Sequence, residues 1–220
     1  MPFFPLNRTS DPVPHAMEAR THNQSSATAE EPHQRLILAG HLILMQGVWL
    51  LCVLTGAHGQ VLPAVVALLI TLGVHHLLVH ERHAFWLTCT GACMVGFGLD
   101  SLLVHLEIIH FPGHPQSTAS VPFMVCLWAN LATGFFFSLR WTLNHHALAL
   151  LLAAIGGPLA YYGGVRLGAL SFTGSTGQTL VILSMYWMAS MVLLMLLVAG
   201  ARHYVQTAVN GEASSCCRPS

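Results

Sequence analysis

Polar and small side chains recur at helical spacing within one apolar stretch, residues 85–109. Two carboxylates in it, Asp100 and Glu107, lie seven residues apart, which is about 10.5 Å along a helix axis at ~1.5 Å per residue. An ionisable side chain at membrane depth costs roughly 2.5–3.5 kcal/mol even on the gentler insertion scale, so each needs a physical reason. Carboxylates placed there could hold a ligand, relay protons or pair with a cation.

A third polar position, Asn130, lies in the next apolar stretch. Counted from the end of the helix that faces outside, Asn130 is about 13 Å deep at ~1.5 Å per residue, and Asp100 is at a similar depth. We therefore expect that the two side chains could meet.

Residues 147–169 are the most informative segment, because small residues recur there at every fourth position. Such a ladder lets another helix approach closely. Pro158 lies mid-segment, where it removes a backbone donor and clashes with the carbonyl of residue 154, so we expect a kink or local unwinding. Arg166 follows near the outer end. The small residues, expected to pack a helix, are Gly156, Ala160, Gly164 and Gly168.

Two interpretations of these groups stay open. In the first, Asp100 or Glu107 pairs with Arg166 as a structural tie, and the small residues only pack helices together. In the second, the polar groups line an outward-facing pocket that holds a ligand head group or relays protons.

Four of the fifteen histidines cluster near the end of an apolar run. Positions 76, 80 and 83 share one helix face, which could bind a transition metal, but the favoured explanation is that interfacial histidines replace lysine in a chain that has none. We assign no metal site and no cofactor. No phosphate-binding loop, serine-hydrolase elbow, zinc-protease or dinucleotide-binding motif is present, so no residue is assigned as catalytic. The four histidines are His75, His76, His80 and His83.

The amino-acid composition indicates the class of fold that holds these residues in place. Eight basic residues, all arginine, balance eight acidic ones, and only 7% of the 220 residues are charged, against ~25% for a soluble domain. Hydrophobic residues make up 54%. These values exclude a soluble globular enzyme, a basic nucleic-acid binder and a disordered chain. They favour an all-α, polytopic transmembrane helical bundle.

A bilayer core needs ~20 apolar residues per helix, and six stretches qualify. The sequence therefore predicts about six spans within residues 35–201, between polar cytosolic tails over 1–34 and 202–220. The first tail is expected to be disordered, because it buries too little surface to offset its ordering entropy. The six expected spans are residues 36–54, 61–79, 85–109, 121–137, 147–169 and 179–199.

The arginines predict the orientation. Seven of the eight fall at the chain ends or in the connections after the second and fourth spans, and only Arg166 falls on the other side. By the positive-inside rule, this distribution predicts that both termini are cytosolic.

Residues 156–161 read Gly-Gly-Pro-Leu-Ala-Tyr, and with segments such as 98–103 and 138–141 they resemble a proteobacterial inner-membrane family catalogued as a domain of unknown function. The resemblance covers roughly residues 36–200. It implies a compact helical bundle in the bacterial inner membrane, with no established activity. The resemblance adds no site, and the candidate binding residues remain those of the polar and proline-interrupted segments: Asp100, Glu107, Asn130, Pro158, Tyr161 and Arg166.

Three functions follow as hypotheses. We expect a protein that binds or moves a lipid or another amphiphile, because a glycine- and proline-interrupted segment beside buried polar groups is the usual pointer to a membrane site. A membrane-embedded lipid-modifying enzyme, with Asp100, Glu107 or His105 as acid–base groups, is the second. In the third, a structural subunit, the small residues dock a partner membrane protein or a second copy of the chain. Membrane lipids are the expected partners, and nucleic acid is not.

Overall fold

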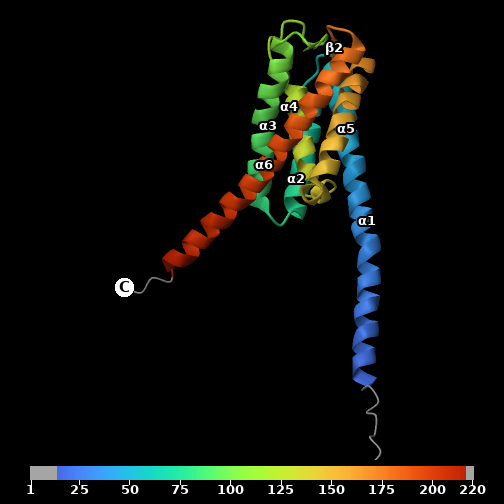
Figure 1. Cartoon of the computed structure of the whole chain (residues 1–220), viewed down its shortest axis with the longest axis vertical. Coiled ribbons are helices and arrows are strands. Elements are labelled where there is room, and N and C mark those ends of the chain that lie inside the picture. The colour runs from blue at the N-terminus through green and yellow to red at the C-terminus, as the bar shows by residue number, and fades with distance from the viewer. Residues whose placement is uncertain (1–13, 217–220) are drawn as a thin grey trace, which may run out of the picture. The chain divides into compact units, whose positions relative to one another are not determined.

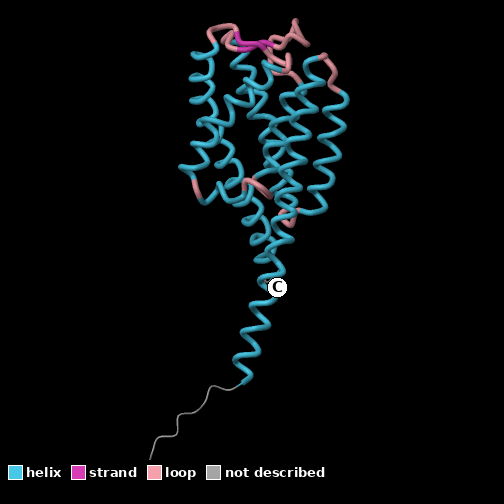
Figure 2. The backbone as a smooth tube through the Cα atoms, turned by 90° about the vertical axis from the view of Figure 1, so that its right-hand side faces the viewer, coloured by secondary structure: helices cyan, strands magenta, loops and turns pink. Residues whose placement is uncertain are grey.

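The computed structural model describes residues 14–216, with side chains for residues 36–210. Within these residues there are six α-helices, one short 3-10 helix and two strands of two residues each, which confirms the predicted all-α fold. The chain divides into two units, residues 1–40 and the part from His41 onward, and the second contains the site. In that unit the helices lie side by side, with the two strands at one end (Figure 2).

Figure 1 shows the order of the elements along the chain. The helices are α1 (Pro14–Ala57), α2 (Leu62–Leu78), α3 (Arg82–His105), α4 (Pro122–Gly134), α5 (His146–Arg166) and α6 (Thr176–Cys216). The 3-10 helix η1 (Arg140–Asn144) precedes α5. Strands β1 (Ile109–His110) and β2 (Ser171–Phe172) pair antiparallel and join the connections that follow α3 and α5.

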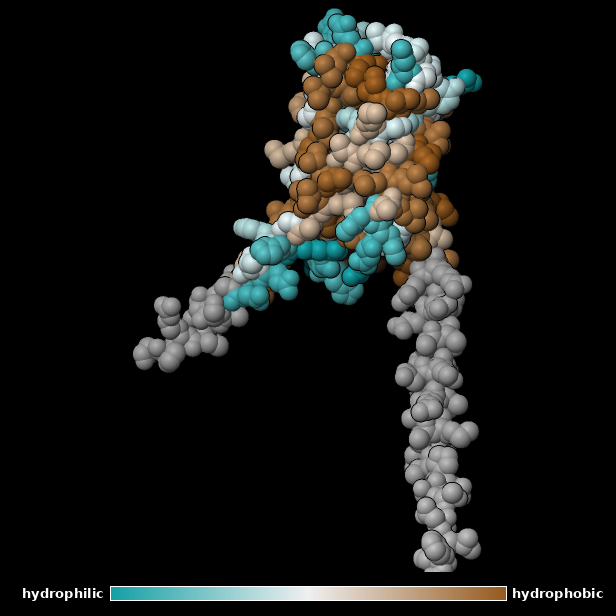
Figure 3. All heavy atoms as spheres, in the orientation of Figure 1, coloured by the Kyte–Doolittle hydropathy of each residue, from teal (hydrophilic) through white to brown (hydrophobic). Residues whose placement is uncertain are grey.

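The outer surface of the bundle is apolar, as the brown side chains in Figure 3 show. Met94 and Leu69, for example, are 73% and 61% exposed. Four helical segments are long and apolar enough to cross a membrane: Leu36–Ala57, α3, α5 and Thr176–Asn210. Because water is a poor solvent for such a surface and lipid is a good one, the chain has the character of a membrane protein.

Helices α2 and α4 are shorter than the spans predicted for them. The 13 residues of α4 extend about 20 Å at ~1.5 Å per residue, which is less than the ~30 Å of a bilayer core. After Gly134 the backbone turns, with the amide of Leu139 bonded to the carbonyl of Gly134 at 2.6 Å. The helix predicted over residues 121–137 therefore ends earlier than predicted, at Gly134, since residues 135–137 are apolar but form turns.

Helix extends into both predicted tails, and the assignment of residues 1–34 and 202–220 as cytosolic tails stays a prediction. Residues 14–34 belong to α1, and α6 continues through Cys216. Residues 16–31 contain many alanine and glutamate residues, which favour helix. The prediction of disorder rests only on the polar composition of this segment. The remaining parts of both predicted tails, residues 1–13 and 217–220, lie outside the described residues.

Two connections at the strand-bearing end meet backbone to backbone. A Cβ on Gly59, whose φ is +67°, would lie 2.8 Å from the carbonyl oxygen of Gly113. A Cβ on Gly113 would lie 2.5 Å from the carbonyl oxygen of Gly56. Glycine is therefore required on both sides of this contact.

Candidate functional site

Asp100 of α3 is fully buried, and its carboxyl group accepts hydrogen bonds from side chains of three other helices. Its Oδ2 accepts a 2.7 Å hydrogen bond from the indole Nε1 of Trp128 in α4. Its Oδ1 accepts hydrogen bonds from the hydroxyls of Tyr161 in α5 and Tyr186 in α6, the latter at 2.7 Å. Three uncharged donors thus surround one carboxyl group and tie α3, α4, α5 and α6 together.

Glycines one turn earlier in the helices make this arrangement possible. A Cβ on Gly96, four residues before Asp100, would lie 2.0 Å from Cγ of Trp128. A Cβ on Gly157 would lie 2.0 Å from Cγ of Trp187 in α6. The two indoles stack on each other, with ring centroids 5.3 Å apart and planes inclined by 7°. Each glycine therefore provides the space that one indole of the stacked pair occupies.

An apolar cavity of about 490 Å³ borders this network, between α1, α4, α5 and α6. Trp128 and Tyr161 form part of its wall, whereas Asp100 does not line it. The volume falls within the ~300–1,000 Å³ typical of small-molecule sites. Asp100 can therefore act on the cavity only through the two aromatic side chains that it holds.

The cavity opens sideways between α1 and α5. Leu152 and Leu159 of α5 line it and are 45% and 60% exposed, and Gly156 between them is exposed as well. Gln46 of α1 is the exposed residue on the facing helix. Because both helices have the length and composition of membrane spans, this opening would face hydrocarbon in a bilayer.

Two polar atoms on the cavity-lining side chains are unsatisfied. Asn130 is 3% exposed, and its Nδ2 donates to the carbonyl of Met45 at 2.9 Å. Its Oδ1 is buried and has no hydrogen-bond partner in the described part of the chain, and the same holds for Nε1 of Trp187. Both atoms are themselves buried, so neither is open to the cavity in this structure.

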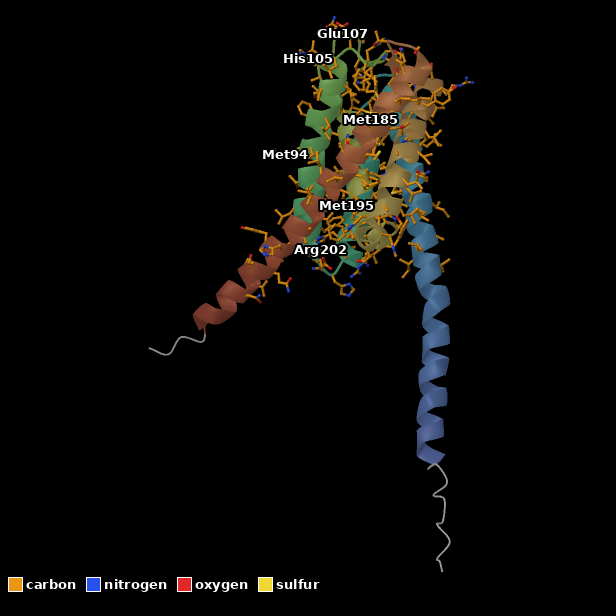
Figure 4. All side chains as sticks on the ribbon, viewed as in Figure 1. Met94, His105, Glu107, Met185, Met195 and Arg202 are labelled. Atoms are coloured by element: carbon orange, nitrogen blue, oxygen red, sulfur yellow. The ribbon has the colours of Figure 1, made fainter. Side chains whose placement is uncertain are left out.

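The structure does not join Asn130 to Asp100, since Asn130 bonds to Met45 instead. Glu107 leaves the face of Asp100, because α3 ends at His105 and Glu107 takes a left-handed φ of 54°. Glu107 and His105 lie at one end of the bundle and Arg202 near the other (Figure 4).

The expected ion pair of Arg166 with Asp100 or Glu107 is wrong. Among residues 36–210, the ion pair found is Arg202 with Glu81. Arg166 and Glu107 are both exposed, and Asp100 is already satisfied by three donors. An arginine at a helix end can extend its charged group into water. This costs less free energy than removing the guanidinium from water to pair with a buried carboxyl group, which explains the difference.

The predicted ladder of small residues lies along the cavity. Gly156, Ala160 and Gly164 line it, and Gly168 lies beyond the end of α5 with a φ of +80°. Trp187 of α6 packs against α5 at Gly157, which is not part of the ladder. The docking of a partner on the ladder stays a prediction.

Pro158 is buried within α5, which is a continuous helix from His146 to Arg166. The expected local unwinding is therefore not found. Membrane helices tolerate proline where neighbouring groups satisfy the freed carbonyl. Pro158 does not line the cavity.

The histidines of the predicted cluster have different neighbours in the structure. The ring of His75 packs against that of His41 with centroids 4.8 Å apart, and Nε2 of His41 lies 3.3 Å from the hydroxyl of Thr133. Nδ1 of His76 instead accepts a 3.1 Å hydrogen bond from Nε1 of Trp86. Among the described residues, no group of three or more His, Cys, Asp or Glu side chains is placed to hold a metal.

Sequence reasoning missed Trp128, Tyr186 and Trp187 as site residues. The signal that could have found two of them is a glycine four residues before a polar residue in an apolar helix, at Gly96 and Gly157. Such a glycine indicates that a large side chain crosses the helix there. Tyr186 carries no comparable signal.

Comparison with known proteins gives a family and no activity. The family model DUF2878, described as a protein of unknown function, matches residues 38–193. No curated protein and no solved structure matches the chain. All of the cavity-lining residues fall within the matched segment.

Proposed function

We propose that this chain, which belongs to the DUF2878 family, binds a lipid or another long-chain amphiphile in the cavity between α1 and α5. Membership confirms the resemblance to a domain of unknown function. The observation that carries the proposal is the cavity itself, because it is apolar, bounded by four helices and open towards the side rather than towards an end.

The polar end of the ligand must decide the specificity. Moving a hydrocarbon chain from lipid into an apolar cavity gains little hydrophobic free energy, because both surroundings are equally dry. A buried polar group without a partner costs about 1–3 kcal/mol, so a ligand gains this free energy if a rotation of Asn130 or Trp187 brings the unused Oδ1 or Nε1 to the cavity surface. A hydroxyl or an amide can donate to the first and accept from the second.

The cavity supports binding better than catalysis. Asp100 does not line it, and Glu107 and His105 are exposed beyond or at the end of α3. Asp100 is therefore a positioning residue, which fixes Trp128 and Tyr161 in the wall. For a lipid-modifying enzyme, the acid–base candidates are Asp100, Glu107 and His105. None of these three residues lines the cavity.

Native mass spectrometry of the purified full chain, with a matched pair of variants, tests the proposal. Gly156→Leu inserts a side chain at the cavity wall, where a Cβ meets nothing within 4 Å. Gly98→Leu adds the same side chain to an exposed position of α3 that is equally open and does not line the cavity. We expect an amphiphile adduct on the wild type and on Gly98→Leu, and its loss from Gly156→Leu.

Equal adducts on all three proteins would place the amphiphile elsewhere and overturn the proposal. A second copy of the chain or another protein lost with Gly156→Leu would instead support the structural-subunit hypothesis.

We also propose a multi-pass location in the bacterial inner membrane, with both termini cytosolic. The support is the arginine distribution, since Arg82, Arg140 and Arg202 lie around Glu81 at one end of the bundle and Arg166 follows α5 at the other. A reporter that is fluorescent only in the cytosol, fused to the C-terminus, should be fluorescent. A dark fusion protein of full length in the membrane would reverse the proposed orientation.

A further inference from the structure

A second, polar pocket of about 140 Å³ lies at the arginine-bearing end of the bundle. It is formed by the connection between α2 and α3, the turn after α4, the start of η1 and α6, and it shares no lining residue with the apolar cavity. Figure 3 shows hydrophilic side chains gathered at this end, directly below the apolar surface of the bundle. The pocket thus lies where a membrane-spanning surface would meet the lipid headgroups.

Arg202 is held in a defined position in this pocket. Its Nε donates a 2.7 Å hydrogen bond to Oε2 of Glu81, and its guanidinium lies 5.4 Å from the centroid of the Phe136 ring. A guanidinium has five N–H donors, and this ion pair uses one of them. Within residues 36–210 the other four have no hydrogen-bond partner, so a planar fork of donors is available to a ligand.

Arg140 lines the same pocket from the start of η1 and is exposed. Among the residues whose side chains are described, no carboxylate pairs with it. Two arginines and one glutamate leave a formal charge of +1 on the pocket, with His80 counted as neutral. Guanidinium groups bind the paired oxygens of phosphate in bidentate fashion, which an ammonium group cannot do.

We propose that this pocket binds the phosphate group of an anionic membrane lipid between Arg140 and Arg202. The lipid chains would lie along the exposed apolar helices beside the pocket, where Leu78 is 57% exposed. Basic pockets between membrane helices on the cytosolic side bind anionic headgroups in this way. Glu81 competes with the phosphate for Arg202 and so weakens the binding.

The test measures how strongly the full chain retains phosphatidylglycerol relative to phosphatidylcholine, by native mass spectrometry from nanodiscs that contain equal amounts of both. The wild type should retain phosphatidylglycerol preferentially. Arg140→Gln should lower this preference about fivefold, because one surface arginine contributes roughly that factor. Glu81→Gln should raise it by a similar factor, and an exposed ion pair of this kind adds little to stability, so the variant should fold.

Arg166→Gln is the matched control, because it removes an exposed arginine at the opposite end of the bundle. An equal loss with Arg140→Gln and Arg166→Gln, or no loss with Arg140→Gln, would overturn the proposal. Gly156→Leu should leave the lipid preference unchanged, so this test and the test of the apolar cavity can fail separately.

Inorganic phosphate distinguishes the two sources of the same chemical group. If the lipid is the ligand, the preference for phosphatidylglycerol persists in phosphate-free buffer and depends on Arg140. Stabilisation of the detergent-solubilised wild type by inorganic phosphate, lost in Arg140→Gln and without any lipid preference, would identify free phosphate and overturn the lipid assignment.

Discussion

The indole Nε1 of Trp128 and the carboxyl Oδ2 of Asp100 are joined by a 2.7 Å hydrogen bond between α4 and α3. A carboxyl group removed from water is costly unless donors replace its hydration, and here uncharged donors do so without a cation. The same Trp128 lines the apolar cavity and stacks on Trp187. The hydrogen bond therefore connects the stability of the bundle to the shape of the cavity.

Asp100→Asn should lower the free energy of unfolding by about 1–3 kcal/mol. The amide keeps the size of the carboxyl but replaces one acceptor with a donor, so that one of the three surrounding donors loses its partner. Unfolding in detergent, followed by tryptophan fluorescence, measures the change. Glu107→Gln, at an exposed position, should leave the free energy unchanged, and equal stability of both variants would contradict a structural role for Asp100.

Tyr161→Phe and Tyr186→Phe each remove one hydroxyl that donates to Oδ1 of Asp100. Each should lower the free energy of unfolding by roughly 1–3 kcal/mol, because the buried carboxyl group loses one of its hydrogen-bond donors. Tyr161 lines the cavity and Tyr186 does not, so only Tyr161→Phe should reduce the amphiphile adduct in native mass spectrometry. The reverse order of adduct loss would show that the wall is not held through Tyr161.

Gly157→Ala and Gly156→Ala separate close packing from open space on adjacent residues of α5. A methyl group at residue 157 would lie 2.0 Å from Cγ of Trp187, whereas one at 156 meets nothing within 4 Å. We expect Gly157→Ala to destabilise by about 1–3 kcal/mol through overpacking. Gly156→Ala should stabilise by about 0.5–1 kcal/mol through helix propensity. Thermal unfolding compares the two, and a similar melting temperature would contradict the packing of Trp187 on Gly157.

Pro158→Ala should leave amphiphile retention unchanged, because Pro158 does not line the cavity and α5 is continuous across it. The substitution restores a backbone donor within a helix, so helix content measured by circular dichroism should not fall. Loss of the amphiphile from this variant would show that the proline ring shapes the cavity from behind its wall.

The sequence indicated that Asp100 needs partners, because a carboxylate in an apolar stretch cannot remain without them. It could not name Tyr161 and Tyr186 as those partners, since hydropathy gives the depth of a residue in a helix but not the helix that it faces. Arg166 lies at the end of α5, where the sequence places it, but within residues 36–210 it is exposed and pairs with neither carboxylate. The number of helices followed from hydropathy, whereas the end of α4 at Gly134 did not, because the residues after it are equally apolar.

The backbone contact of Gly59 with Gly113 restricts where labels can be introduced into this chain. An epitope tag or a fluorescent reporter inserted in either connection would force apart two main chains that pack without side chains between them. The connection around Gly174 is exposed, and a Cβ there would meet only the hydroxyl oxygen of Thr179, at 3.8 Å. Internal labels for mapping which end of the bundle faces which compartment belong at Gly174.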